Sequence, residues 1–527
     1  MPPKPKPERK KSKPRDLIFA VLLGVFAFMM TDCLIQTRSL GIEFSVGAVG
    51  MISSAVWYLR PVLRVKSLYS ALCVALFAVG SVSMIFSADS AVKALTLLCL
   101  MILYVCLLTE TMNLRAWAAG SFRSIGDFFY TGFGASFGKI GDGVYALFHR
   151  EKEASKKNST ALRVLLGILI AIPVMVILGA LLCRADEAFN GMLRDISLGS
   201  LPKELNSLVF AVFLFILLFS QLFCVRFIKR EARSESEKGF DPIILTAFLT
   251  AVSALYIAYL FSQLSYFFSG FGGFLPADFT YAEYARRGFF ELTAVSVINI
   301  MIVLLSSSFS KKRGKQLFLP VRLNLLFLCV FSLILTATEI TKMKMYTDAY
   351  GLTRLRILTT LFMIFLAIVF SALIISIFAR RFPYMKIAVI SAAVLAISVN
   401  FLSVDRTVAE YNTRAYQNGA LKEVDVYTIT ELGDAAVPYL LELAQCGNEK
   451  YEKPARENLE YRLQVLHGYE DIMLYTSDED EYFSYKEYNG KLVPYDFRGF
   501  NTVSYRARQL LLENEKLFSD TKQKESI

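Results

Sequence analysis

Eleven long apolar runs constrain the fold of this 527-residue chain more than any other feature. A helix that crosses the hydrocarbon core of a bilayer needs about 20 apolar residues. Runs near that length lie at 17–36, 43–59, 68–87, 91–109, 161–183, 207–226, 242–268, 289–309, 319–340, 357–379 and 385–403. The pattern excludes a single soluble core. It predicts an all-α polytopic membrane protein with about 11 transmembrane helices, embedded in a lipid bilayer.

The distribution of charge predicts how the chain is oriented in the membrane. The N-terminal tail is basic and rich in proline, so we expect it in the cytoplasm, attracted to anionic lipid of the inner leaflet. The basic loops that follow fall on the same side by the positive-inside rule. Eleven spans then place the C-terminus outside the cytoplasm, where the tail from residue 403 carries 15 Lys and Arg against 23 Asp and Glu. The predicted location is the cell membrane.

Composition divides the chain into five predicted parts. These are a basic cytoplasmic tail (1–16), a four-helix membrane region (17–109), a cytoplasmic loop (110–160), a seven-helix membrane domain (161–403) and an extracytoplasmic C-terminal domain (404–527). The last part is mainly helical, with a helix predicted from Asp405 to Gln417 and another capped by Asp434. The tyrosine-rich and acidic stretch 470–500 has the composition of a loop with short strands.

The loop 110–160 has a helical stripe of apolar residues. The residues recur at steps of three and four from Phe122 to Phe148, which indicates an amphipathic helix. Such a helix either lies in the inner interface of the membrane or packs on the cytoplasmic ends of the spans. Seven glycines between 120 and 143 weaken the helical pattern.

The sequence lacks the residues that several kinds of catalytic and metal-binding site require. The two histidines, His149 and His467, fall on opposite sides of the predicted topology, so neither a histidine metal site nor a Ser-His-Asp triad is expected. Seven of the eight cysteines lie in or beside apolar runs, which leaves Cys446 alone in the tail and excludes a disulfide framework there. We predict no cofactor, no metal and no nucleic-acid partner.

Charged residues at the predicted outer face form the candidate site. Glu283, Arg287 and Glu291 are four residues apart and share one helix face. Arg286 lies beside them, and Glu339 and Lys342 lie near the outer end of the next span. The full candidate set is Glu283, Arg286, Arg287, Glu291, Glu339, Lys342, Asp348, Arg354 and Arg356. The set is either an ion-pair network that holds the spans together or an anion site with arginine donors.

Three segments carry a resemblance to a known family. They are YAEYARRGFFELTAVSVIN (281–299), KMYTDAYGLTRLR (344–356) and DRTVAEYNTRAY (405–416) followed by LGDAAVPYL (432–440). With these segments the chain resembles the bacterial membrane family catalogued as domain of unknown function 4173, over residues 160–445. The resemblance implies a multi-pass bacterial inner-membrane protein without an assigned activity, and it supplies no catalytic residues.

Three hypotheses for function follow from the sequence. The first is a non-enzymatic membrane protein that binds, senses or helps to assemble or move an anionic envelope component at the outer face. The second is a membrane enzyme that acts on a lipid-linked envelope substrate, with Glu283, Glu291 or Asp348 as base. The third is a scaffold that holds a partner protein through the C-terminal domain.

Overall fold

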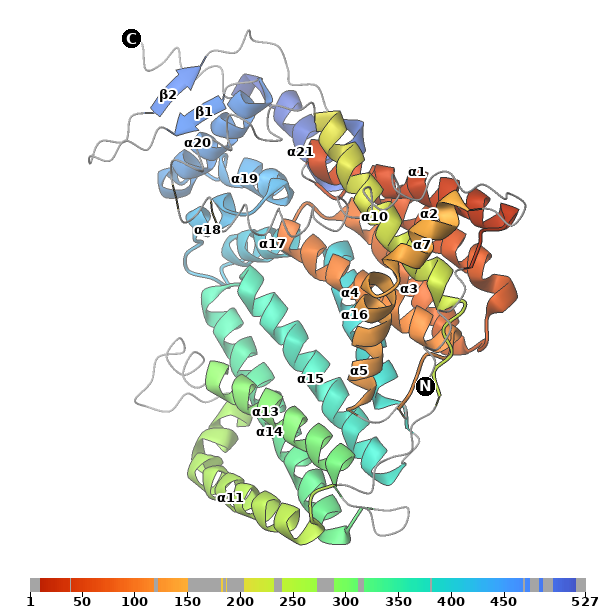
Figure 1. The fold of residues 1–527 in the computed structure, drawn as a ribbon. Coiled ribbons are helices and arrows are strands. Elements are labelled where there is room, and N and C mark those ends of the chain that lie inside the picture. The colour runs from red at the N-terminus through yellow and green to blue at the C-terminus, as the bar shows by residue number, and fades with distance from the viewer. Residues whose placement is uncertain are drawn as a thin grey trace, which may run out of the picture. The chain divides into compact units, whose positions relative to one another are not determined.

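The computed structural model describes residues 10–37, 39–117, 122–149, 182, 186, 203–231, 239–272, 289–310, 317–379, 382–467, 470–473, 483–486 and 496–517. Within these ranges, ten helices are long and apolar enough to cross a membrane. The predicted class, an all-α polytopic membrane protein, is therefore confirmed (Figure 1).

Ten of the eleven predicted spans coincide with long helices. These are α1 (Pro14–Thr37), α2 (Ile42–Leu59), α3 (Leu68–Ser83), α4 (Ser90–Thr111), α10 (Lys203–Val225), α11 (Pro242–Gly272), α13 (Phe289–Phe309), α14 (Leu319–Tyr350), α15 (Arg354–Phe378) and α16 (Tyr384–Leu402). The remaining predicted span, 161–183, lies outside the described residues except for Leu182. The largest difference is in α14, which continues beyond 340 as far as Tyr350.

The contacts within the chain define two compact units. The first comprises Met1–Val82, Leu97–Ala119 and Arg123–Glu235, and the second comprises Ser83–Thr96, Gly120–Phe122 and Ser236–Ile527. The start of α4 thus belongs to the second unit and the rest of that helix to the first.

In the first unit, α1 packs against both α2 and α10. The ring of Phe19 stacks on Tyr58 of α2, with 4.0 Å between centroids, and contacts Phe219 of α10 at 6.2 Å. A Cβ atom added at Gly47 would lie 2.9 Å from Cγ of Met30 and 3.1 Å from the carbonyl oxygen of Phe26. Small residues let membrane helices approach closely. The glycines that weaken the apolar pattern of 43–59 therefore serve its packing.

The amphipathic stripe of the loop 110–160 forms a broken helix. It consists of α5 (Ser124–Phe129), the π turn η3 (Tyr130–Gly134), α6 (Ala135–Phe137) and α7 (Ile140–Phe148). Phe129, Phe133 and Phe137 stack in sequence and are exposed. Ile140 and Val144 are buried against Ile216 of α10. The stripe therefore divides into an exposed aromatic part and a packed aliphatic part.

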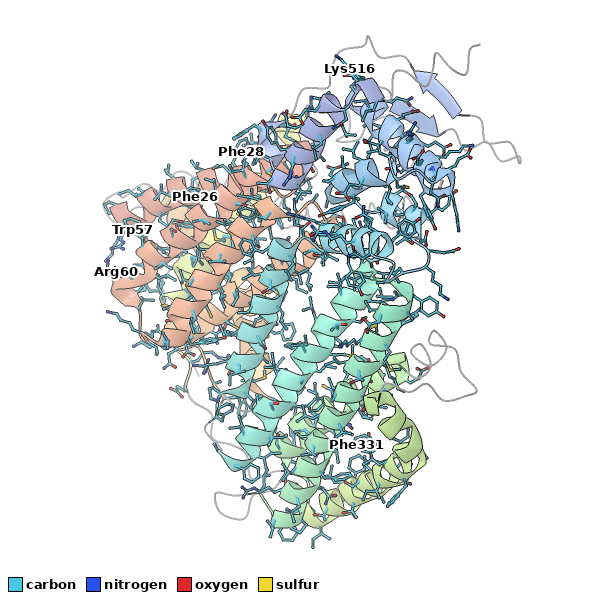
Figure 2. All side chains as sticks on the ribbon, turned by 180° about the vertical axis from the view of Figure 1, so that it is seen from behind. Phe26, Phe28, Trp57, Arg60, Phe331 and Lys516 are labelled. Atoms are coloured by element: carbon cyan, nitrogen blue, oxygen red, sulfur yellow. The ribbon has the colours of Figure 1, made fainter. Side chains whose placement is uncertain are left out.

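A buried polar network joins three membrane helices of the second unit. Tyr256 of α11 donates a hydrogen bond to Oδ1 of Asn299 in α13 at 2.8 Å, and Nδ2 of Asn299 donates to Oγ of Ser332 in α14 at 2.9 Å. The Tyr256 ring also stacks on Phe331, which Figure 2 shows among these helices. Hydrogen bonds between spans satisfy polar groups that lipid cannot.

The C-terminal residues form a mainly helical domain, as predicted. Its elements are α17 (Val404–Gln417), α18 (Val426–Thr430), η4 (Asp434–Ala436), α19 (Val437–Leu443), α20 (Glu449–Leu466), β1 (Glu470–Met473), β2 (Phe483–Lys486), η5 (Phe497–Gly499) and α21 (Thr502–Glu513). The antiparallel pair β1–β2 confirms the short strands expected in 470–500. The prediction that Asp434 caps a helix is wrong. A 3-10 turn precedes α19, and the Asp434 side chain pairs with Arg462 instead.

The core of this domain continues into the ends of the membrane helices. Val408, Ile429, Leu440 and Leu459 are fully buried in one apolar cluster. The same cluster includes Val399 of α16 and is packed by Leu352, Ile357 and Leu358, from the turn before α15 and from its first two turns. The domain and the ends of α15 and α16 are therefore stabilised by shared apolar burial.

Candidate functional site

The structure describes six of the nine predicted site residues. Glu283, Arg286 and Arg287 lie outside the described residues. Glu291 is exposed in the first turn of α13. The four-residue ladder of Glu283, Arg287 and Glu291 therefore remains a prediction.

Glu339 is the most deeply buried of the six predicted residues that the structure describes. Its side chain lies on α14 with the residue only 1% exposed, and neither carboxylate oxygen has a hydrogen-bond partner among the described residues. The half-buried Lys342, one turn later, interacts with it electrostatically. Buried carboxylates without hydrogen bonds are costly when charged.

Arg354, at the start of α15, binds a carboxylate of the chain itself. Its Nη2 donates to Oδ2 of Asp405 at 2.7 Å, and its Nε donates to Oδ1 of the same carboxylate. A second carboxylate, Asp89, lies 3.9 Å from Nε. This forked pairing is the strong form of an arginine ion pair. The donors that an anion site would require from Arg354 are thus directed at Asp405.

Arg356 is also directed at groups of the chain. Its Nη1 donates to the carbonyl oxygen of Tyr350 at 3.2 Å and to that of Gly351. The guanidinium lies 3.9 Å from the centroid of the Tyr346 ring. It therefore stabilises the end of α14, where the last carbonyls of a helix lack helical partners. Asp348 is exposed nearby.

Asp405 connects Arg354 to the C-terminal domain. The residue is 3% exposed, and Oδ2 also accepts a hydrogen bond from the backbone N–H of Gly433 at 3.1 Å. The loop that carries Gly433 is held by Arg462 of α20, whose Nη2 donates to the carbonyls of Thr430 at 3.2 Å and Leu432 at 2.8 Å. Burial lowers the pKa of the Arg462 guanidinium.

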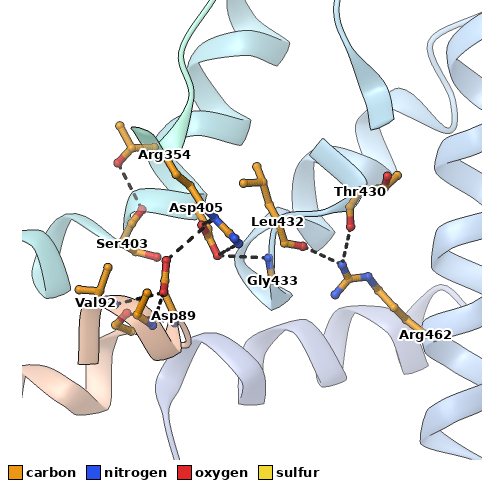
Figure 3. Close-up of polar contacts among 12 residues, drawn as sticks. Asp89, Val92, Arg354, Ser403, Asp405, Thr430, Leu432, Gly433 and Arg462 are labelled. Carbon is orange, nitrogen blue, oxygen red and sulfur yellow. Dashed lines mark hydrogen bonds and ion pairs between the residues drawn. The ribbon is translucent and has the colours of Figure 1, made fainter. Parts of the chain in front are cut away.

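These contacts form one cluster, which we name the junction cluster: Asp89, Arg354, Asp405, Gly433 and Arg462. Figure 3 shows the side chains converging from α15, α17, α20 and the residues before α4. The cluster thus links the beginnings of two membrane helices to the C-terminal domain.

Asn412 of α17 makes a second connection to the membrane helices. Its amide accepts a hydrogen bond from the backbone N–H of Leu352 at 2.7 Å and donates one to the carbonyl of Leu352 at 2.8 Å. The preceding Gly351 has φ +77°, and a Cβ atom there would lie 2.5 Å from Oδ1 of Asn412. The turn between α14 and α15 thus requires glycine for its backbone and for its approach to Asn412.

A polar hollow lies at the other end of α17. This surface hollow has a volume of about 810 Å³ and is lined by Tyr416, Gln417, Gly419, Leu421, Lys422, Glu442, Gln445 and Cys446. Both Lys422 and Cys446 are exposed. The lining offers amide, hydroxyl and charged groups to a polar ligand.

Sequence reasoning missed the carboxylates that the arginines bind. Arg354 and Asp405 are 51 residues apart, so no helical spacing relates them. The first unit also contains pairs that were not predicted, Asp16 with Arg226 at 2.6 Å and Asp127 with Arg230 at 2.7 Å. For Asp16 and Asp405 the available signal was an acid beside one end of an apolar run, which required a partner. Asp127 lies in the loop 110–160 and gave no such signal.

The ten apolar helices define the class of the molecule as a multi-pass integral membrane protein. The chain belongs to the family described as Domain of unknown function (DUF4153), whose model matches residues 71–443. No curated protein and no solved structure matches the chain.

The resemblance to domain of unknown function 4173 is therefore wrong. The matched segment contains all three motifs on which it rested, but it assigns them to a different family. The match also begins inside α3, so the third and fourth spans, which the resemblance excluded, belong to the family region.

Proposed function

We propose that this protein binds and senses a component of the cell envelope through its C-terminal domain and transmits the bound state to its membrane helices. The observation that carries the proposal is the course of α17. One end of this helix contributes Asp405 to the junction cluster, and the other end contributes Tyr416 and Gln417 to the surface hollow.

A rigid helix with a ligand site at one end and a membrane contact at the other can couple the two. Asn412 fixes the middle of α17 to the turn before α15, so a rotation of α17 would change both that turn and the Arg354–Asp405 pair. A ligand acts on such an element only if it binds one arrangement better than the other.

The lining of the surface hollow suggests the class of ligand. Lys422 supplies a positive charge, Gln445 supplies an amide and Tyr416 supplies an aromatic surface. The lining also contains the carboxylate of Glu442, which accepts a hydrogen bond from Nε2 of Gln417 at 3.3 Å. These groups suit a polar envelope component whose negative charge lies against Lys422. The proposal includes the predicted topology, with the N-terminus in the cytoplasm near anionic lipid and the C-terminal domain outside it.

The enzyme alternative has less support in the described residues. It requires Glu291 and Glu339 in one polar cavity open to the outer leaflet. Glu339 is buried in α14, whereas Glu291 is exposed at the start of α13, so the two carboxylates have different surroundings. The scaffold alternative uses the same C-terminal domain and differs only in the kind of partner.

The proposal can be tested with a matched pair of lysine variants. Lys422→Glu reverses the charge in the surface hollow, and Lys453→Glu makes the same change on the exposed face of α20, outside the hollow. Each protein is purified in mild detergent, and the co-purifying molecules are identified by mass spectrometry. We expect the wild type and Lys453→Glu to retain an envelope component that Lys422→Glu loses.

Equal retention by all three proteins would contradict a site in the hollow. Recovery of a protein partner with no small envelope component would favour the scaffold alternative. Cys446 gives an independent readout, because a ligand in the hollow should slow the reaction of this exposed thiol with a maleimide.

A further inference from the structure

An apolar cavity in the first unit opens beside basic residues. The cavity has a volume of about 250 Å³ and lies between α2, α3 and α4, with Ile52, Ala55, Val74 and Leu107 among its apolar lining. The polar side chains of its lining include Lys66, Ser67, Ser70 and Thr111, which lie at the ends of these helices near the linker 60–67. The cavity is thus apolar along its length and polar at one end.

Backbone hydrogen bonds hold the linker 60–67 at the polar end of this cavity. The N–H groups of Arg64 and Val65 donate to the carbonyl of Thr111 at 3.0 and 3.1 Å, and both Val65 and Thr111 line the cavity. Outside the lining, Ser45 of α2 donates to the carbonyl of Ser81 in α3 at 2.6 Å, which joins two of the three helices that form the cavity.

Aromatic and basic residues indicate how deep in the membrane the polar end of the cavity lies. Trp57 is 41% exposed, and the guanidinium of Arg15 lies 4.5 Å from the centroid of its ring. Trp57 and Arg60 lie together at one edge of this unit (Figure 2). Exposed tryptophan beside arginine is typical of the membrane–water interface. The polar end therefore lies at headgroup level, and the apolar part extends into the acyl region.

The charges at the polar end favour an anion. Lys66 is exposed and makes no hydrogen bond or ion pair with the residues that the structure describes. Arg64 donates to the uncharged carbonyls of Met112 at 3.0 Å and Arg226 at 3.2 Å, so these bonds leave its charge uncompensated. The nearby carboxylate of Glu110 is paired with Arg115 and also accepts a hydrogen bond from the hydroxyl of Ser67 at 3.4 Å. The anion is therefore expected beside Lys66.

We propose that this cavity binds one acyl chain of an anionic phospholipid, with the phosphate held by Lys66. Its volume is below the ~300 Å³ at which pockets for whole small molecules begin. One acyl chain of the lipid therefore enters the cavity, and its second acyl chain remains in the bilayer. The site differs from the lipid attraction predicted for the basic N-terminal tail, which rests on charge alone.

The test compares variants that fill the cavity with variants that do not. Val74→Phe adds volume inside the lining, and Val79→Phe makes the same change on the exposed face of α3. Each protein is reconstituted in vesicles of phosphatidylglycerol and phosphatidylcholine in a 1:3 ratio, extracted in mild detergent and examined by native mass spectrometry. We expect the wild type and Val79→Phe to retain one phosphatidylglycerol that Val74→Phe loses. Equal retention by the two variants would overturn the proposal.

A charge variant tests the headgroup separately. Lys66→Gln should lower the preference for phosphatidylglycerol over phosphatidylcholine by about fivefold, the factor that ~1 kcal/mol per basic residue implies. Lys139→Gln, an exposed lysine outside the lining, should leave the preference unchanged. If Val74→Phe does not fold, Ala71→Leu replaces it as a smaller filling change. A wild type that retains both lipids in proportion to the vesicle would also overturn the proposal.

Discussion

At the scale of single residues, Asp405 is a carboxylate whose loss should release the C-terminal domain. It accepts hydrogen bonds from two nitrogens of Arg354 and from the N–H of Gly433. Asp405→Asn keeps the shape but removes the charge, and hydrogen bonds to charged groups contribute about 1.5–3 kcal/mol. We expect a lower apparent Tm and faster proteolysis after residue 403. Asp496→Asn, at an exposed pair, is the control and should change neither.

For Glu339 we expect the opposite result, namely that removal of the charge does not lower the amount of folded protein. Its carboxylate is buried and lacks a hydrogen-bond partner among the described residues, so neutral glutamine should be tolerated at this position. We expect Glu339→Gln to accumulate in the membrane at or above the wild-type level, as measured by fluorescence-detection size-exclusion chromatography. A marked loss of folded protein would instead show that the carboxylate is ionised and paired, as the predicted charge network requires.

The sequence predicted which charges were unusual but not what they contact. Arg354 and Arg356 stood out because they lie directly before an apolar run. Their acceptors, Asp405 and the carbonyls of Tyr350 and Gly351, depend on how α17 packs on the turn after α14. Such tertiary contacts have no periodicity in the sequence.

At the scale of elements, the contact between α7 and α10 depends on one glycine. A Cβ atom at Gly143 would lie 2.5 Å from the Cα of Ser220, and a backbone atom cannot rotate away. Gly143→Ala should therefore destabilise the first unit by about 1–3 kcal/mol, the cost of overpacking. Gly141 lies on the same helix with nothing within 4 Å of an added Cβ atom. Gly141→Ala should be neutral or stabilising, and thermal unfolding in detergent compares the two.

The length of the apolar runs predicted the membrane helices well and the ends of those helices less well. Ten helices coincide with predicted spans because lipid requires long apolar segments with internally bonded backbones. The extension of α14 to Tyr350 was not predicted, because Lys342, Lys344 and Asp348 ended the apolar run there. Those residues remain helical because the helix end packs on α17 through Asn412 and Gly351.

At the scale of the whole molecule, the predicted membrane topology determines which parts of the chain face the cytoplasm. Cys446 is exposed, whereas five of the other six described cysteines are buried. In cells without an outer barrier, it should react with a membrane-impermeant maleimide. An engineered Ser236→Cys, tested in a Cys446→Ala background, should not react. Labelling at position 236 and not at Cys446 would show that the orientation in the membrane is the reverse of the predicted one.

The pairing of Asp16 with Arg226 has a consequence for how the protein is made. The ribosome completes α1 well before α10, because the partner of Asp16 lies 210 residues later in the chain. At about 5–20 residues per second, this carboxylate waits roughly 10–40 s for its arginine. During that interval α1 has neither the ion pair nor the apolar face of α10. Although α1 is made before α2 and α10, its packing is therefore completed only when α10 has been synthesised.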